Sequence, residues 1–163
     1  MKLVSLTLTA MIVGLILVST PLAQDEKAQI PSKGSTNYAT SYTFRKLTDL
    51  EMEGTGSAWV TEILGITRNT DGKPYFDQMS VRCVGYAQVV DEETTYYGAC
   101  VETDKDGDQV YTTYDMEAHY LVGGTGKYVG ISGKAPFRST TLKSIGPNID
   151  AGIVDHAVTW EFK

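Results

Sequence analysis

Two adjacent segments decide the fold class: Met79-Ser-Val-Arg-Cys-Val-Gly-Tyr-Ala-Gln-Val-Val90 and Tyr96-Tyr-Gly-Ala-Cys-Val-Glu-Thr103. Both alternate in hydrophobicity and are rich in Val and Tyr, and the polar stretch 91–95 between them is a turn signal, so they predict a β-hairpin. A hairpin centred on residues 91–92 places Cys83 directly opposite Cys100, where cross-strand Cβ atoms come near disulfide distance. We predict a Cys83–Cys100 disulfide, with two free buried thiols as the alternative.

The rest of the chain continues as short strands. Stretches rich in Val, Ile, Thr, Tyr and Phe are separated by clusters of Gly, Asp, Asn and Pro, without a long helical periodicity. Seven or eight strands predict one all-β domain over residues 37–163, an antiparallel sandwich or barrel. The expected strands are 37–46, 57–68, 76–90, 96–103, 109–122, 128–133, 136–142 and 153–162.

The first residues have the layout of a secretory signal. Met1-Lys2 precedes a largely apolar run from Leu3 to Val18, which is followed by a helix-breaking proline and then by charged residues. We predict a signal peptide over residues 1–24, because the run is shorter than the roughly 20 residues that span a bilayer; an uncleaved anchor is the alternative. Residues 25–36 are expected to form a mobile polar leader. The expected localisation is secreted or periplasmic, with no stable membrane span after cleavage.

Charge and residue spacing limit the partners. The 163-residue chain has 14 basic and 20 acidic residues, a net charge of −6, and nucleic-acid binding needs a clustered basic face, so we expect no nucleic-acid partner. The two cysteines and two distant histidines do not form the ligand pairs of a zinc site, and we expect no metal.

The stretch 109–122 is the most informative of the expected strands. Taken as one strand, it has an even face to be buried and an odd face that carries Asp115, Glu117 and His119. We interpret the odd face as a solvated outer surface; a carboxylate–imidazole site for a metal or for acid–base chemistry is the alternative. The even face comprises Val110, Thr112, Tyr114, Met116, Ala118, Tyr120 and Val122.

Two further motifs suggest ions or phosphates. Asp104-Lys-Asp-Gly-Asp108 has the alternating carboxylates of a calcium loop but not the glycine and glutamate spacing of an EF-hand, so we interpret it as a hairpin turn, with weak calcium binding left open. The run Gly123-Gly-Thr-Gly-Lys127 lacks the spacing of a phosphate-binding loop. Its glycines are expected to serve a turn or bulge.

The segment Tyr120-Leu-Val-Gly-Gly-Thr-Gly-Lys-Tyr-Val-Gly-Ile-Ser-Gly133 resembles the signature of the allene oxide cyclase-like and dirigent-like β-barrels. The resemblance implies an eight-stranded antiparallel barrel with a mostly apolar interior cavity, which is often oligomeric. It also implies that the protein binds or converts a hydrophobic or phenolic small molecule without a cofactor. The matched residues resemble fold determinants of that family, so no catalytic role transfers with them.

Two classes of function follow. The first is a binding barrel for a hydrophobic or phenolic small molecule without defined catalysis; the second is a cofactor-free cyclase, isomerase or dirigent-type protein that uses the same cavity. Inward-facing aromatic residues either fill a core or line a pocket, and the sequence leaves both open. For the second class the titratable residues to test are Glu62, Arg82, Asp115, Glu117 and Arg138. The expected ligand-binding residues are Tyr42, Tyr114, Met116, Tyr120 and Trp160.

Overall fold

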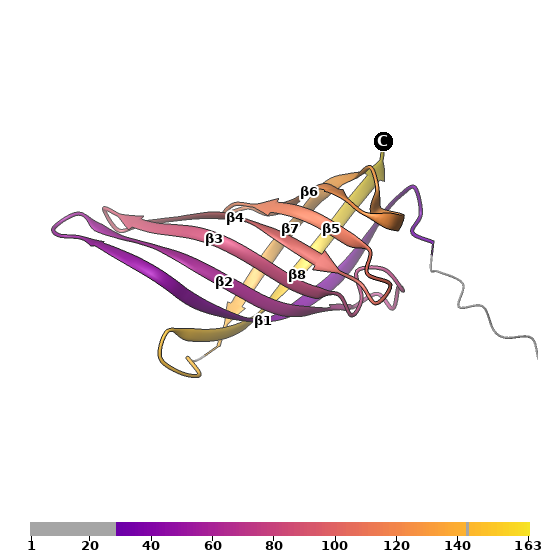
Figure 1. The fold of residues 1–163 in the computed structure, drawn as a ribbon. Coiled ribbons are helices and arrows are strands. Elements are labelled where there is room, and N and C mark those ends of the chain that lie inside the picture. The colour runs from indigo at the N-terminus through magenta and orange to yellow at the C-terminus, as the bar shows by residue number, and fades with distance from the viewer. Residues whose placement is uncertain (1–28, 143) are drawn as a thin grey trace, which may run out of the picture.

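The computed structural model describes residues 29–142 and 144–163, which form a closed antiparallel barrel in which each strand pairs with the next and β1 pairs with β8 (Figure 1). The all-β barrel expected from the sequence is confirmed. No helix in this described part has the length and hydrophobicity that a bilayer crossing needs. The strands are β1 (Lys33–Met52), β2 (Gly56–Asn69), β3 (Ser80–Val90), β4 (Glu93–Thr103), β5 (Gln109–Tyr114), β6 (Ala118–Gly124), β7 (Ile131–Thr141) and β8 (Ile149–Phe162).

The β3–β4 hairpin has the register expected from the cysteines. Cys83 pairs with Cys100 across the two strands, and their sulfurs form a disulfide on the inner face of the barrel. The turn consists of two residues, Asp91 and Glu92, because Val90 pairs with Glu93. Both turn residues adopt positive φ, and this geometry matches the twist of strands joined by a two-residue hairpin turn.

The expected strand 109–122 is wrong as a single element. A tight turn at residues 115–117 divides it into β5 and β6, which pair with each other. Asp115 makes this turn, since its carboxylate accepts the backbone N–H groups of Glu117 and Ala118, an alternative to the strand ladder that Asp offers readily. The turn changes the alternation, so the inward residues of β6 are His119 and Leu121.

Three other boundaries also differ from expectation. The two expected strands 128–133 and 136–142 merge into one strand, β7, which begins at Ile131 and ends at Thr141. The expected number of strands still holds, because one expected strand divides and two merge. Residues 76–79 form a loop, in which Phe76 and Gln78 have positive φ. β1 begins at Lys33, which removes residues 33–36 from the expected mobile leader, because this stretch pairs with β8. The expected signal peptide, residues 1–24, lies outside the described residues.

One end of the barrel is filled by a cluster of buried side chains that we call the floor. Its rings stack and tilt against one another, as in the pair Tyr38–Phe76, whose ring centroids lie 5.5 Å apart. The indole N–H of Trp160 donates to the carbonyl of Pro31 at 2.8 Å, which ties the start of the described chain to this end. The floor comprises Tyr38, Phe76, Met79, Val110, Leu121, Tyr128, Ile131, Ala135, Val158 and Trp160.

The glycine-rich segment and the aspartate turn meet at the same end. The short 3-10 helix η1 (Gly126–Tyr128) follows β6 and places Tyr128 in the floor. The Lys127 ammonium lies 2.7 Å from an Asp104 carboxylate oxygen and 2.9 Å from one of Asp106, while its backbone N–H donates to Asp108. In this structure the aspartate turn therefore binds a lysine of the neighbouring loop.

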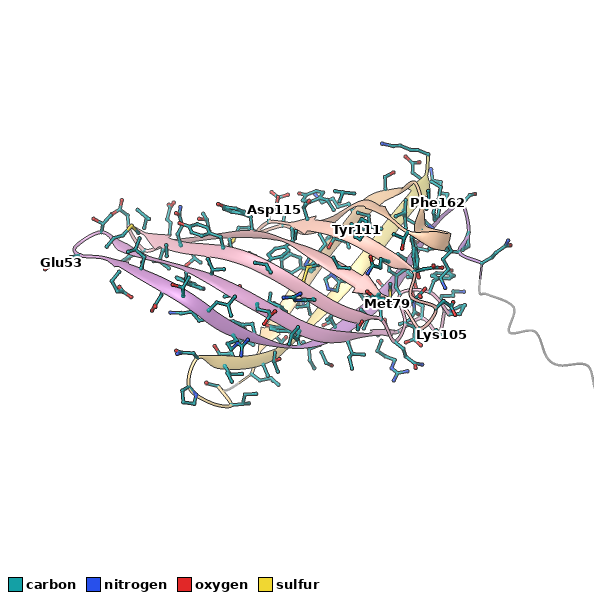
Figure 2. The ribbon with its side chains drawn as sticks, in the orientation of Figure 1. Glu53, Met79, Lys105, Tyr111, Asp115 and Phe162 are labelled. Carbon is teal, nitrogen blue, oxygen red and sulfur yellow. A yellow bond between two sulfur atoms is a disulfide. The ribbon has the colours of Figure 1, made fainter. Side chains whose placement is uncertain are left out.

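The opposite end is wider and less covered. Strands β1 to β4 extend beyond the β5–β6 turn, and the β1–β2 hairpin forms the far tip (Figure 1). Figure 2 shows Glu53 at this tip and Met79 and Phe162 at the filled end. The interior is thus packed at one end and accessible from the other.

Removal of the disulfide is expected to lower stability without changing the fold. The bond joins residues 17 positions apart, and closing a loop of that size stabilises by about 3 kcal/mol on the chain-entropy account. The double variant Cys83→Ala/Cys100→Ala should therefore lose about 3 kcal/mol of unfolding free energy in urea. Two thiols that react with an alkylating agent in the unreduced, denatured native protein would contradict the bond.

Candidate functional site

A cavity of about 380 Å³ lies above the floor and opens toward the wide end of the barrel. All the strands except β5 and β6 contribute at least two residues to it, and the lining is mainly apolar and aromatic. That size and lining are typical of a site for one small organic molecule. The lining residues are Thr40, Tyr42, Phe44, Trp59, Thr61, Ile63, Val81, Cys83, Tyr86, Ala87, Thr94, Tyr96, Glu102, Tyr114, His119, Phe137, Ser139, Thr141, Val154 and His156.

The aromatic rings of the wall lie against neighbouring glycines, which leaves the centre open. A Cβ on Gly85 or Gly98 would overlap the hydroxyl of Tyr114, so this ring extends from β5 across β4 to β3. Tyr42 similarly covers Gly152 of β8 and reaches the Ser139 hydroxyl of β7 at 3.2 Å. Only glycine permits such close approach of a ring to a strand.

Glu102 is the acidic residue of the lining. It belongs to β4, two residues after Cys100, and is 3% exposed. Its Oε2 atom has no hydrogen-bond partner within the protein, although buried polar atoms are normally paired. Burial raises the pKa of Glu102 to about 7, because the carboxylate loses its hydration without gaining a positive neighbour.

Two histidines lie on the opposite side of the cavity. The ring centroids of His119 and His156 are 4.9 Å apart, edge to face, and His156 also stacks on Tyr38 at 4.5 Å. Burial lowers the pKa of His119 to about 4 and that of His156 to about 3, so both rings are neutral at pH 7. Nδ1 of His119 lies 3.5 Å from the Thr112 hydroxyl, whereas Nδ1 of His156 has no partner within the protein.

Two of the five expected ligand-binding residues line the cavity and three do not. Tyr42 and Tyr114 are in the lining. Met116 is in the β5–β6 turn and is 46% exposed, because the turn takes it out of the strand. Tyr120 lies on the outer face of β6, where its hydroxyl donates to Asp115, and Trp160 is part of the floor.

The titratable residues expected inside the barrel lie outside the cavity. Glu62 binds Arg45 and Arg82 in salt bridges on the outer face, and Arg138 is exposed on β7. Asp115 and Glu117 are in the turn, so they do not form a row with His119. The interpretation of His119 as a solvated outer residue is wrong for the same reason.

The sequence contained a signal for the groups that line the cavity. Glu102 has the same parity as Cys100, and His156 has the same parity as Val158 and Trp160. Once the cysteines face inward, a period-two strand brings Glu102 inward as well. His119 had no such signal, because its orientation depends on the Asp115 turn.

The packing of Tyr114 on Gly85 gives a prediction with a built-in rescue. Gly85→Ala places a methyl group on the Tyr114 hydroxyl, so we expect a loss of about 1–3 kcal/mol in unfolding free energy. Adding Tyr114→Phe removes that oxygen and leaves the nearest ring carbon, Cζ, 3.2 Å away, so the double variant should recover most of the loss. Gly98→Ala is the control, since its methyl would also meet the backbone carbonyl of Val84 and Tyr114→Phe cannot relieve it. Equal rescue at both glycines in urea unfolding would contradict the packing.

The unpaired carboxylate gives a prediction for pH. The pKa of Glu102 is about 7 in the folded protein against an ordinary 4.5, so the unfolded chain releases this proton at lower pH than the folded protein does. The contribution of Glu102 to the free energy of unfolding is fully present below about pH 4.5, where the carboxyl group is protonated in both states. It is lost as the pH rises through about 7, and the total loss is about 3 kcal/mol. Glu102→Gln should therefore exceed the native protein by about 3 kcal/mol near pH 8 and match it near pH 4.5.

Urea unfolding of both proteins across this range measures the difference. The depressed pKa values of His119 and His156 act in the opposite direction, because their contribution is present above about pH 6.5 and is lost as the pH falls toward 4 and 3. They act equally in the native protein and the variant, so the difference reports Glu102. A difference that does not change with pH would show that Glu102 titrates normally.

Comparison with solved structures finds a similarity to the pterocarpan synthase dirigent protein GePTS1, at 15% sequence identity and a TM-score of 0.43, over 80% of this chain and 93% of that chain. No protein-family profile matches the sequence, and no curated protein matches it either. A similarity at this level transfers neither a family nor a residue role, and the resemblance of the sequence to allene oxide cyclase-like and dirigent-like barrels stays a prediction.

Proposed function

We propose that this chain is an exported β-barrel that binds one hydrophobic or phenolic small molecule in its interior cavity, without defined catalysis. The observation that carries the proposal is the cavity itself: about 380 Å³, with aromatic walls, above a filled floor. Eight-stranded barrels are just wide enough either to be filled by side chains or to hold one small ligand. This barrel is filled over one part of its length and open over the other.

The polar groups of the cavity support a specific ligand. Hydroxyls and the neutral rings of His119 and His156 are distributed over the wall, and Glu102 lies at its deep end. A few placed polar groups in an apolar pocket orient a ligand, and this is the usual composition of small-molecule sites.

Export is part of the proposal and rests on two features. The first is the signal-like segment 1–24. The second is the Cys83–Cys100 disulfide, which is consistent with an oxidising compartment such as the periplasm or the extracellular space.

A cofactor-free cyclase or isomerase, or a dirigent-type protein, is the second candidate. Glu102 favours it, because a carboxyl group inside a cavity with a pKa of about 7 is suited to proton transfer near neutral pH. Native mass spectrometry of the protein purified from its own source separates the candidates. A ligand recovered unchanged supports binding, whereas its conversion on incubation, with the conversion lost in Glu102→Gln, supports the enzyme.

Binding in the cavity is tested with a phenolic probe, 2-naphthol, followed by its fluorescence. Ala87 lines the cavity on β3, so Ala87→Trp should fill the space and weaken binding by about 10-fold or more. Ala99→Trp is the matched control, because Ala99 is exposed on the neighbouring strand β4 and this variant should bind as the native protein does. Failure of the native protein to bind would contradict the proposal, and equal losses in both variants would place binding outside the cavity and contradict it as well.

A further inference from the structure

The deep end of the cavity contains a carboxyl group with no partner. Glu102 is only 3% exposed, and it belongs to the lining of the cavity. Its Oε2 atom forms no hydrogen bond within the protein. Such a group reduces stability whenever it is ionised, so its presence inside an apolar cavity requires an explanation.

The surrounding protein supplies no positive charge. On the neighbouring strands Glu102 pairs with Val81 and Val110. The Glu102 charge helps to raise the pKa of the Tyr38 and Tyr128 hydroxyls, and neither hydroxyl carries a positive charge. None of the described lining residues is a lysine or an arginine. The histidines of the lining stay neutral at pH 7 because burial lowers the pKa of each.

A metal ion does not suit this position either. Within residues 29–142 and 144–163, no three side chains of His, Cys, Asp or Glu lie close enough together to hold one. Glu102 would be a single ligand among apolar neighbours, and stable sites for divalent ions need several.

The rest of the cavity favours an organic cation. Its rings include Tyr42, Trp59, Tyr96 and Tyr114, which offer an aromatic surface to the apolar body of such a molecule. His156 adds a second unpartnered buried atom, Nδ1, which can accept a hydrogen bond in one neutral tautomer. The net charge of −6 also raises the local concentration of cations around the protein.

We propose that the cavity takes a small molecule with a protonated primary amine on an aromatic or apolar body, with the ammonium group bound to the Glu102 carboxylate. The inference rests on the proposed function, since it names the ligand class of the same cavity. The ammonium supplies the missing charge and hydrogen-bond donors, and the aromatic walls contact the apolar body. A molecule with a carboxylate is excluded by like-charge repulsion, and a neutral hydroxyl compound binds more weakly because its hydrogen bond is not charge-assisted.

Three indole compounds of similar size test the charge directly: tryptamine, tryptophol and indole-3-acetate, which carry an ammonium, a hydroxyl and a carboxylate. Calorimetric titration of the full chain near pH 8 should give tryptamine about 10-fold tighter binding than tryptophol, with indole-3-acetate weakest. In Glu102→Gln the advantage of tryptamine should disappear while tryptophol changes by less than about 3-fold. Glu161→Gln, the same change at an exposed outer residue of β8, should leave all three affinities as in the native protein.

The pH profile of the native protein gives a second readout that needs no variant. Tryptamine affinity should rise between about pH 5 and 8 as Glu102 ionises, whereas tryptophol affinity should stay nearly flat. Equal affinities for tryptamine and tryptophol, or a tryptamine affinity that Glu102→Gln leaves unchanged, would overturn the inference even if 2-naphthol still binds in the cavity. If none of the indoles and no 2-naphthol binds, the proposed function fails and the inference fails with it.

Discussion

The interior of this barrel depends on tyrosine rings whose hydroxyl ends lie against glycines of neighbouring strands. Tyr114 covers Gly85 and Gly98, and Tyr42 covers Gly152. A tyrosine directed at the axis of an eight-stranded barrel would occupy the centre, since barrels of this size have room for little more than their own side chains. When the ring lies along the wall, the same side chain becomes a lining surface. The glycines are therefore what makes a cavity possible in a barrel this rich in tyrosine.

The same principle divides the barrel along its length. At the floor the rings of Phe76, Tyr128 and Trp160 pack against one another, and this cluster contains the most deeply buried side chains of the described chain. Above it, the rings contact backbone and leave space. The floor and the Cys83–Cys100 disulfide thus supply much of the stability of the fold. The cavity can therefore carry buried polar groups that reduce stability, namely Glu102 and the two uncharged histidines.

Sequence patterns were sufficient where local rules decide the structure. The register of Cys83 and Cys100 followed from counting along one hairpin. The number of short alternating strands predicted an all-β sandwich or barrel, and the resemblance of the glycine-rich segment implied the barrel. The patterns failed where one side chain changes the rule, because Asp115 binds backbone N–H groups and reverses the alternation after it. They also could not separate floor from cavity. Tyr38 and Tyr42 lie on one face of one strand, yet Tyr38 packs in the floor and Tyr42 lines the cavity, which depends on contacts with loops far along the chain.

Two acidic residues at the end of β4 show why the cavity is the place to look for a partner. Asp104 and Glu102 are separated by one residue, and both are largely buried. Asp104 is paired, since Lys127 reaches it from the glycine-rich loop at 2.7 Å. Glu102 lines the cavity, and the Tyr38 and Tyr128 hydroxyls near it carry no positive charge. The chain thus pairs Asp104 with a lysine of its own loop, whereas Glu102, which lines the cavity, has no positive partner within the described protein. A positive partner for Glu102 has to enter from that space, and the aromatic walls suit an organic cation better than an inorganic one because they can contact its apolar body.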